Sequence, residues 1–212
     1  HDMTAISEQY PTLYHFNSAT LTSIFPDLTF QEKVMLFDCY QSLNQSSDSL
    51  AFVGYGNHSA STFLWQLELI RNIFPNKSVI GIYIDFVLES SIESLGNSDS
   101  TIYSLHIDDQ LAANFTSIFN AHQLTHINAL FMEPSLADHS IFEHYIQWFQ
   151  PYFHPSAPLI IRGKHSEFPI LNGHHQFTPF DFNAPLNHRH YAFKTNQLQN
   201  DYDLLGFKLM SN

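Results

Sequence analysis

Two short apolar runs, at residues 50–56 and 79–86, enclose a segment in which apolar residues recur at helical spacing. A strand, a turn, a helix and a second strand form a βαβ unit, whose strands lie parallel in one sheet. The first run ends in Gly54-Tyr55-Gly56, where we expect the backbone to bend, and Ser59 to Thr62 can begin the helix. The free N–H groups of that helix would face the strand ends, so this crevice can hold a nucleotide-like ligand.

The rest of the chain repeats this alternation. Thr29-Phe30-Gln31-Glu32 is a capping box, in which the Thr29 hydroxyl accepts from the N–H of Glu32 while the Glu32 carboxylate reaches back. Helices are predicted over residues 29–43, 108–123 and 135–149, and further strands over residues 101–107, 128–133 and 158–162.

The C-terminal part loses this periodicity. We expect a long loop over residues 163–187, then two strand-like runs at 190–195 and 205–210 that can pair as an antiparallel hairpin. The predicted fold class is α/β: a doubly wound, mostly parallel Rossmann-like sheet with helices on both faces and a C-terminal antiparallel hairpin.

A length of 212 residues and 44% hydrophobic content fit one globular unit with a full core. We interpret residues 1–2, before Met3, as a remnant of cloning. Residues 3–48 are expected to form an N-terminal helical cover, and residues 49–212 the α/β domain.

The charge narrows the choice of partners. Twenty acidic residues against eight Lys and Arg give a net charge of −12, which should repel nucleic acid and anionic membranes. A small-molecule substrate is favoured, and a homodimer or a partner protein stays open. No apolar run is long enough for a membrane helix and no signal peptide is recognisable, so we expect a cytoplasmic protein.

Fourteen histidines invite a metal hypothesis. His174-His175 and the pair His188 and His190 lack the i,i+4 spacing that would place two imidazoles on one helix face. His188 and His190 could share one face of a strand, but a third ligand would still be needed. We therefore predict no metal site.

Three further segments carry a family resemblance: Leu130-Phe131-Met132-Glu133, Asp138-His139-Ser140, and Trp148-Phe149-Gln150-Pro151 before the fifth strand. With the order of strands and helices, they resemble the class I S-adenosylmethionine-dependent methyltransferases over roughly residues 30–210. The branch that looks most similar contains small-molecule methyltransferases and cephalosporin-hydroxylase-like proteins.

The resemblance implies a set of cofactor contacts. Gly54 and Gly56, with Tyr55 between them, would border the methionine part of S-adenosylmethionine, and Ser59 stands near a position where the family often has a further glycine. Asp108, just after the third strand, matches an acid that often contacts the adenine amine. Glu133 matches the fourth-strand acid near the amino end of the cofactor or the transferred methyl.

Two positions depart from the family pattern. Phe52 stands where an acid usually precedes the first glycine, and Tyr83 stands where a second-strand acid usually holds the ribose hydroxyls. Asp85, on the same face of the strand as Tyr83, could substitute only if the strand end shifts. The metal-dependent catechol-type branch needs an Asp-Asn pair after strand five, but that strand ends Ile161-Arg162-Gly163, so a magnesium mechanism is rejected.

The leading interpretation is methyl transfer from S-adenosylmethionine to a small molecule, with Glu133 or His139 as the base. The alternative is a degenerate member that has lost cofactor binding and acts as a binding subunit or partner in a biosynthetic pathway, which Phe52 and Tyr83 favour. A third keeps the fold but uses the crevice for another ligand or a different reaction. The glycines could equally be turn residues, Asp108 a helix N-cap and His139 a histidine bonded to backbone.

Overall fold

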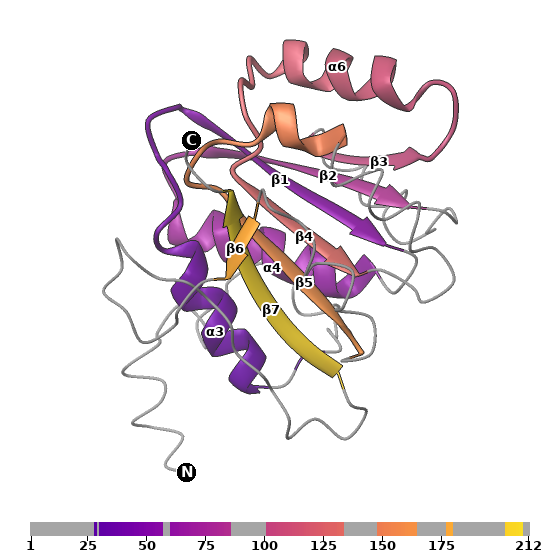
Figure 1. The fold of residues 1–212 in the computed structure, drawn as a ribbon. Coiled ribbons are helices and arrows are strands. Elements are labelled where there is room, and N and C mark those ends of the chain that lie inside the picture. The colour runs from indigo at the N-terminus through magenta and orange to yellow at the C-terminus, as the bar shows by residue number, and fades with distance from the viewer. Residues whose placement is uncertain are drawn as a thin grey trace.

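The computed structural model describes residues 28, 30–56, 60–85, 101–133, 148–164, 177–179 and 202–209. These residues form a seven-stranded sheet with the strand order β3-β2-β1-β4-β5-β7-β6 (Figure 1). The pairs among β1 to β5 are all parallel, whereas β7 pairs antiparallel with both β5 and β6. The order β3-β2-β1-β4-β5 is that of doubly wound nucleotide-binding sheets. The predicted α/β class, with a mostly parallel Rossmann-like sheet and helices on both faces, is confirmed.

The strands are β1 (Ser49–Gly56), β2 (Ser78–Asp85), β3 (Ile102–His106), β4 (Ala129–Glu133), β5 (Pro158–Lys164), β6 (Phe177–Pro179) and β7 (Tyr202–Leu209). The helices are α3 (Phe30–Tyr40), α4 (Ala60–Ile73), α6 (Leu111–Ala121) and the short 3-10 helix η3 (Gln150–Tyr152).

The helices cover opposite faces of the sheet. Figure 1 shows α6 on one side and α3 and α4 on the other. Alternate residues of β1 follow this division: Phe52 packs with α3 and α4, whereas Val53 and Tyr55 pack with α6. A strand buried on both faces needs the continuous apolar run that the sequence shows over residues 50–53.

The predicted bend at the first two glycines is not observed. Strand β1 continues through Gly56, with Gly54 paired to Tyr83 and Phe131 and Gly56 paired to Asp85 and Glu133. Among the described glycines none has a positive φ. The extended backbone is favoured here because β1 has a hydrogen-bonded neighbour on each side up to its last residue.

Other element boundaries differ by a few residues. Helix α3 ends at Tyr40 rather than Leu43, whose side chain is nevertheless buried. Strand β5 continues beyond Arg162 to Lys164, because β7 pairs with it along its whole length. The short strand β6, also paired with β7, lies within the predicted loop.

Some predictions fall outside the described residues. Thr29, needed for the capping box, is one of them, as are residues 190–195, the first arm of the predicted hairpin. The hairpin therefore stays a prediction, although β7 covers most of its second arm. Of the helices that the structure describes, none combines the length and the apolar character needed to cross a membrane.

Two histidines lie side by side near the amino ends of β4 and β5. The rings of His126 and His154 are 5.3 Å apart and nearly perpendicular. Nδ1 of His154 accepts a hydrogen bond from the backbone N–H of Ser156 at 3.1 Å. Burial lowers the pKa of His154, and the neighbouring His126 lowers that pKa further. The fold therefore favours the neutral form of His154.

This preference predicts a pH dependence of stability. The pKa of His154 lies lower in the folded than in the unfolded chain, where it is about 6.5. Its stabilising contribution is therefore present above about pH 6.5 and is lost as the pH falls through the folded-state value. We expect His154→Asn, whose side-chain oxygen can still accept from Ser156, to reduce the difference between the unfolding free energies measured in urea at pH 7.5 and pH 5. The other titrating groups are common to both proteins, so equal pH dependence would contradict this role of His154.

Candidate functional site at the carboxyl edge of the sheet

The candidate site lies where the strand order reverses. From β1 the chain builds outward to β2 and β3, and then returns to β4 on the other side. Ligands of open α/β sheets bind outside the carboxyl ends of the strands at this switch point. The final residue of β1, Gly56, is paired on one side with Asp85 and on the other with Glu133, each the last residue of its strand. Gly56, Asp85 and Glu133 therefore lie next to one another at the carboxyl edge of the sheet.

Below this edge the space between the sheet and α4 is filled by aromatic rings. The rings of Phe52 and Phe63 stack with centroids 4.9 Å apart, and the ring of Phe63 contacts that of Tyr83 at 5.1 Å. All three side chains are buried. The two positions where the family usually carries acids are therefore occupied by core aromatics, which leaves no acid at either for a ribose or a cofactor amine.

Gly54 lies directly under one of these rings. A Cβ atom on Gly54 would be 2.3 Å from Cδ2 of Phe63 and 3.1 Å from Cδ2 of Tyr83. The absence of a side chain at this position thus lets α4 approach the sheet, which is sufficient to explain the glycine without a ligand. Contact of Gly54 or Tyr83 with a cofactor stays a prediction.

Gly56 has a different neighbour. A Cβ atom there would lie 3.1 Å from the backbone oxygen of Glu133 and 3.3 Å from its Cβ atom. The glycine allows β1 and β4 to approach closely at the switch point, where the backbone of β1 is nearest to any bound ligand.

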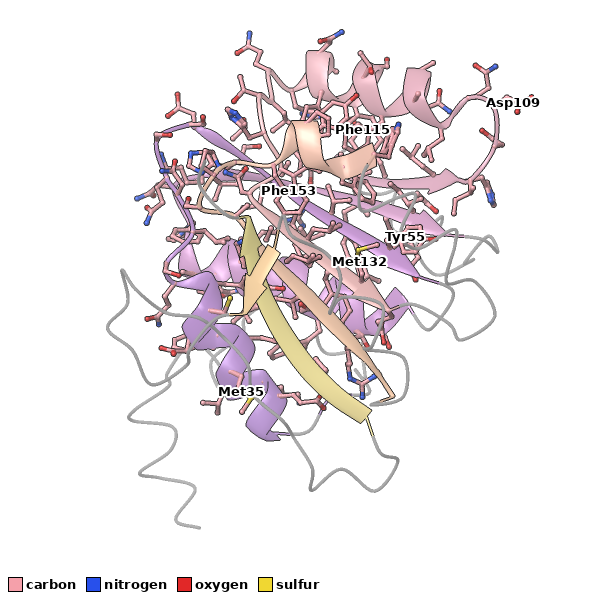
Figure 2. All side chains as sticks on the ribbon, viewed as in Figure 1. Met35, Tyr55, Asp109, Phe115, Met132 and Phe153 are labelled. Atoms are coloured by element: carbon pink, nitrogen blue, oxygen red, sulfur yellow. The ribbon has the colours of Figure 1, made fainter. Side chains whose placement is uncertain are left out.

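Tyr55 points to the opposite face. Its ring packs edge-on against Phe149 with centroids 6.4 Å apart, and its side chain is buried on the α6 side of the sheet. Figure 2 shows it next to Met132, its register partner on β4. As a predicted cofactor residue, Tyr55 could contribute its backbone, since its ring belongs to the core.

Glu133 is held in an ion-pair network that the sequence did not indicate. Its Oε2 accepts from Nη1 of Arg162 at 3.3 Å, and Nε of Arg162 donates to Oε2 of Glu32 at 2.9 Å. The three side chains are at most 7% exposed. Glu133, proposed from sequence as a base, therefore has one carboxylate oxygen engaged by a guanidinium.

The sequence predicted other roles for the two residues that complete this network, Glu32 and Arg162. Glu32 fits a capping box, a local motif, and a contact with residue 162 has no local signature. Arg162 was considered only as the end of a strand. The available signal was an arginine directly after the apolar run at residues 158–161, since a charge within a buried strand requires a buried partner.

Of the remaining predicted site residues, one lies apart from this network and two lie outside the residues that the structure describes. Asp108 is exposed, and its Oδ1 accepts from the N–H of Gln110 at 2.8 Å, two residues on, just before α6 begins. The N-cap position itself belongs to Gln110, so Asp108 supports the helix start from two residues earlier. Ser59 and His139 lie outside the described residues, as do His174-His175 and His188-His190. Within the described ranges no group of three or more His, Cys, Asp and Glu side chains could hold a metal ion.

Comparison with known proteins identifies the architecture. No protein-family model matches the sequence, and no curated protein matches it significantly. An rRNA methylase from Streptococcus thermophilus superposes with a TM-score of 0.51 over 88% of this chain and 100% of its own, at 13% identity. The chain has the class I methyltransferase fold.

Two further solved structures are similar at lower scores. The mitomycin 7-O-methyltransferase MmcR has a TM-score of 0.41 and 10% identity, over 85% of this chain and 55% of its own. The methyltransferase subunit of a type I restriction-modification system from Streptococcus thermophilus has a TM-score of 0.43 and 11% identity, over 87% and 44%. At these identities the similarity concerns the methyltransferase fold and not the acceptor.

The packing at Gly54 can be tested by a double-mutant cycle. We expect Gly54→Ala to lower the free energy of unfolding by about 1–3 kcal/mol, the usual cost of overpacking, because stacking on Phe52 and Tyr83 prevents the Phe63 ring from moving aside. Phe63→Leu is expected to create the space that the added methyl needs. Urea unfolding of the two single variants and the double variant gives the coupling between the sites. Strictly additive losses would show that Phe63 is not what requires a glycine at position 54.

Proposed function

We propose that this protein binds S-adenosylmethionine at the carboxyl edge of β1, β2 and β4 and transfers its methyl group to a small-molecule acceptor. The observation that carries the proposal is the position of Gly56 between Asp85 and Glu133, at the switch point of a methyltransferase fold. A bare backbone between two acids suits a ligand that carries both ribose hydroxyls and an ammonium group.

The acceptor is proposed from charge. Twenty acidic residues against eight Lys and Arg disfavour a polyanionic acceptor such as RNA, so the rRNA acceptor named for the Streptococcus thermophilus protein is not carried over. A small neutral or cationic molecule fits the net charge of −12 better. A cytoplasmic location and a homodimer or partner protein stay predictions.

Methyl transfer places few demands on side chains. The reaction needs the acceptor nucleophile and the sulfonium to be held in line, and a base only where the acceptor loses a proton. Because Arg162 engages Glu133, we assign Glu133 to ligand positioning rather than to proton removal. His139 remains the candidate base by sequence.

A second function is favoured by a specific observation. Phe52, Phe63 and Tyr83 form one buried aromatic cluster, and Phe52 and Tyr83 occupy the two positions where the family usually has acids, so the chain could keep the fold and bind no S-adenosylmethionine. It would then act as a non-catalytic binding subunit.

Calorimetry with S-adenosylmethionine and S-adenosylhomocysteine distinguishes these functions. We expect saturable binding of both ligands by the unmodified protein. If millimolar ligand produces no binding heat and no rise in melting temperature, the methyltransferase proposal is wrong and the binding-subunit function remains.

The site can then be located with two matched aspartates on the same sheet. Asp85 ends β2 at the carboxyl edge, whereas Asp48 is exposed just before β1, at the amino edge. We expect Asp85→Asn to weaken the binding of both ligands about tenfold, the usual effect of losing one charge-assisted hydrogen bond to ribose, and Asp48→Asn to leave it unchanged. Equal affinities for the two variants would mean that the ribose does not lie at Asp85.

A further inference from the structure

Three charged side chains from distant parts of the sequence meet beside the switch point. Arg162 lies on β5 next to Glu133 on β4, and Glu32 reaches it from the first turn of α3. Nε of Arg162 serves one carboxylate and Nη1 the other. The network that links β4 and β5 is therefore completed by a helix residue that lies 130 positions before Arg162 in sequence.

Stability of the fold alone gives little reason for such a network. Burying ionised groups is costly, and well-packed apolar residues of similar size often replace a buried ion pair without loss. The neighbouring residues on the same strand and helix, such as Phe131 and Leu36, are apolar. Apolar side chains at the three charged positions would have continued the same core.

The geometry also requires arginine in particular. The guanidinium is planar and directs several N–H groups at fixed angles, so it can hold two carboxylates in a defined relation to each other. A lysine would carry the same charge at one point, without fixing the orientation of either partner.

We propose that Arg162 is a positioning residue: it fixes the Glu133 carboxylate beside Gly56, and Glu32 in turn fixes Arg162. This inference rests on the proposed binding of S-adenosylmethionine and assigns to α3 a part in that site. Orienting a ligand-facing group through a second, buried layer of hydrogen bonds is how binding sites gain their precision.

The helix that carries Glu32 is itself firmly anchored. Leu36 and Tyr40 are completely buried, and the Tyr40 hydroxyl donates a hydrogen bond to Oε1 of Gln66 on α4. Nε2 of Gln66 donates to the backbone oxygen of Thr62 at 3.2 Å. The C-terminal end of α3 is thus fixed to α4 by a buried polar contact, and the helix that carries Glu32 is held by this contact and by its buried apolar residues.

The test compares this network with a second arginine that lies far from the carboxyl edge. Arg71 on α4 donates to Glu68 at 3.0 Å and to the backbone oxygen of Val79, near the start of β2. Arg162→Lys and Arg71→Lys make the same chemical change in two networks, and only the first is connected to the switch point. Calorimetry with S-adenosylmethionine and S-adenosylhomocysteine measures affinity, and thermal unfolding measures stability.

We expect Arg162→Lys to weaken the binding of both ligands about tenfold or more, and Arg71→Lys to change it by less than about twofold, whatever each does to the melting temperature. Position 32 separates orientation from packing. Glu32→Gln keeps an oxygen that accepts from Arg162 and should retain most of the affinity. Glu32→Leu fills a similar volume but cannot accept a hydrogen bond, and we expect it to lower the affinity about tenfold. Should Arg162→Lys fail to fold, the two Glu32 variants carry the test.

The outcomes separate this inference from the function on which it rests. No binding by the unmodified protein overturns both. A second outcome is that the unmodified protein binds, that Glu32→Leu and Glu32→Gln have equal affinities, and that Arg162→Lys and Arg71→Lys also have equal affinities. The proposed function would then stand, and the network would only support the fold.

Discussion

The contact between the ring of Phe63 and the bare backbone of Gly54 determines how α4 lies on the sheet. At this position α4 lies so close to β1 that a single added carbon would overlap the ring. The same ring is stacked on Phe52 and touches Tyr83, so three elements are joined through one side chain. Close packing of α4 against β1 therefore accounts for the glycine at position 54, whereas Gly56 lies at the switch point beside Glu133.

Polar groups near the switch point follow a different rule. Along the α3 and α4 face, β4 and β5 are apolar up to Phe131 and Ile160, and two residues further each strand carries a charged residue, Glu133 on β4 and Arg162 on β5. The two charged residues follow the apolar part of each strand, and their side chains form an ion pair with each other. Because Glu32 comes from α3, the helix before the first strand takes part in the charge balance of the edge, which makes it more than a cover for the core.

How far the sequence predicted this protein depends on the range of each interaction. Strands β1 to β5 and helices α4 and α6 were predicted because apolar periodicity is local and strong in a sheet buried on both faces. The bend at the glycines was wrong because glycine tolerates a turn but does not require one, and the paired neighbours β2 and β4 keep the backbone extended. The network around Arg162 could not be predicted, since its partners lie 29 and 130 residues away.

The displacement of acids along the strands has a geometric consequence for a ligand. Where the family usually has an acid at the position of Tyr83, this chain has Asp85, two residues later and therefore about 6.6 Å further along the strand. Glu133 ends β4 at the same level, since both are register partners of Gly56. With the aromatic stack filling the space below, a nucleoside held by these groups would lie at the outer end of the strands and not over Gly54. Its affinity would then depend on how firmly the last residues of β2, β1 and β4 are oriented, and at β4 we propose that Arg162 and Glu32 provide this orientation through Glu133.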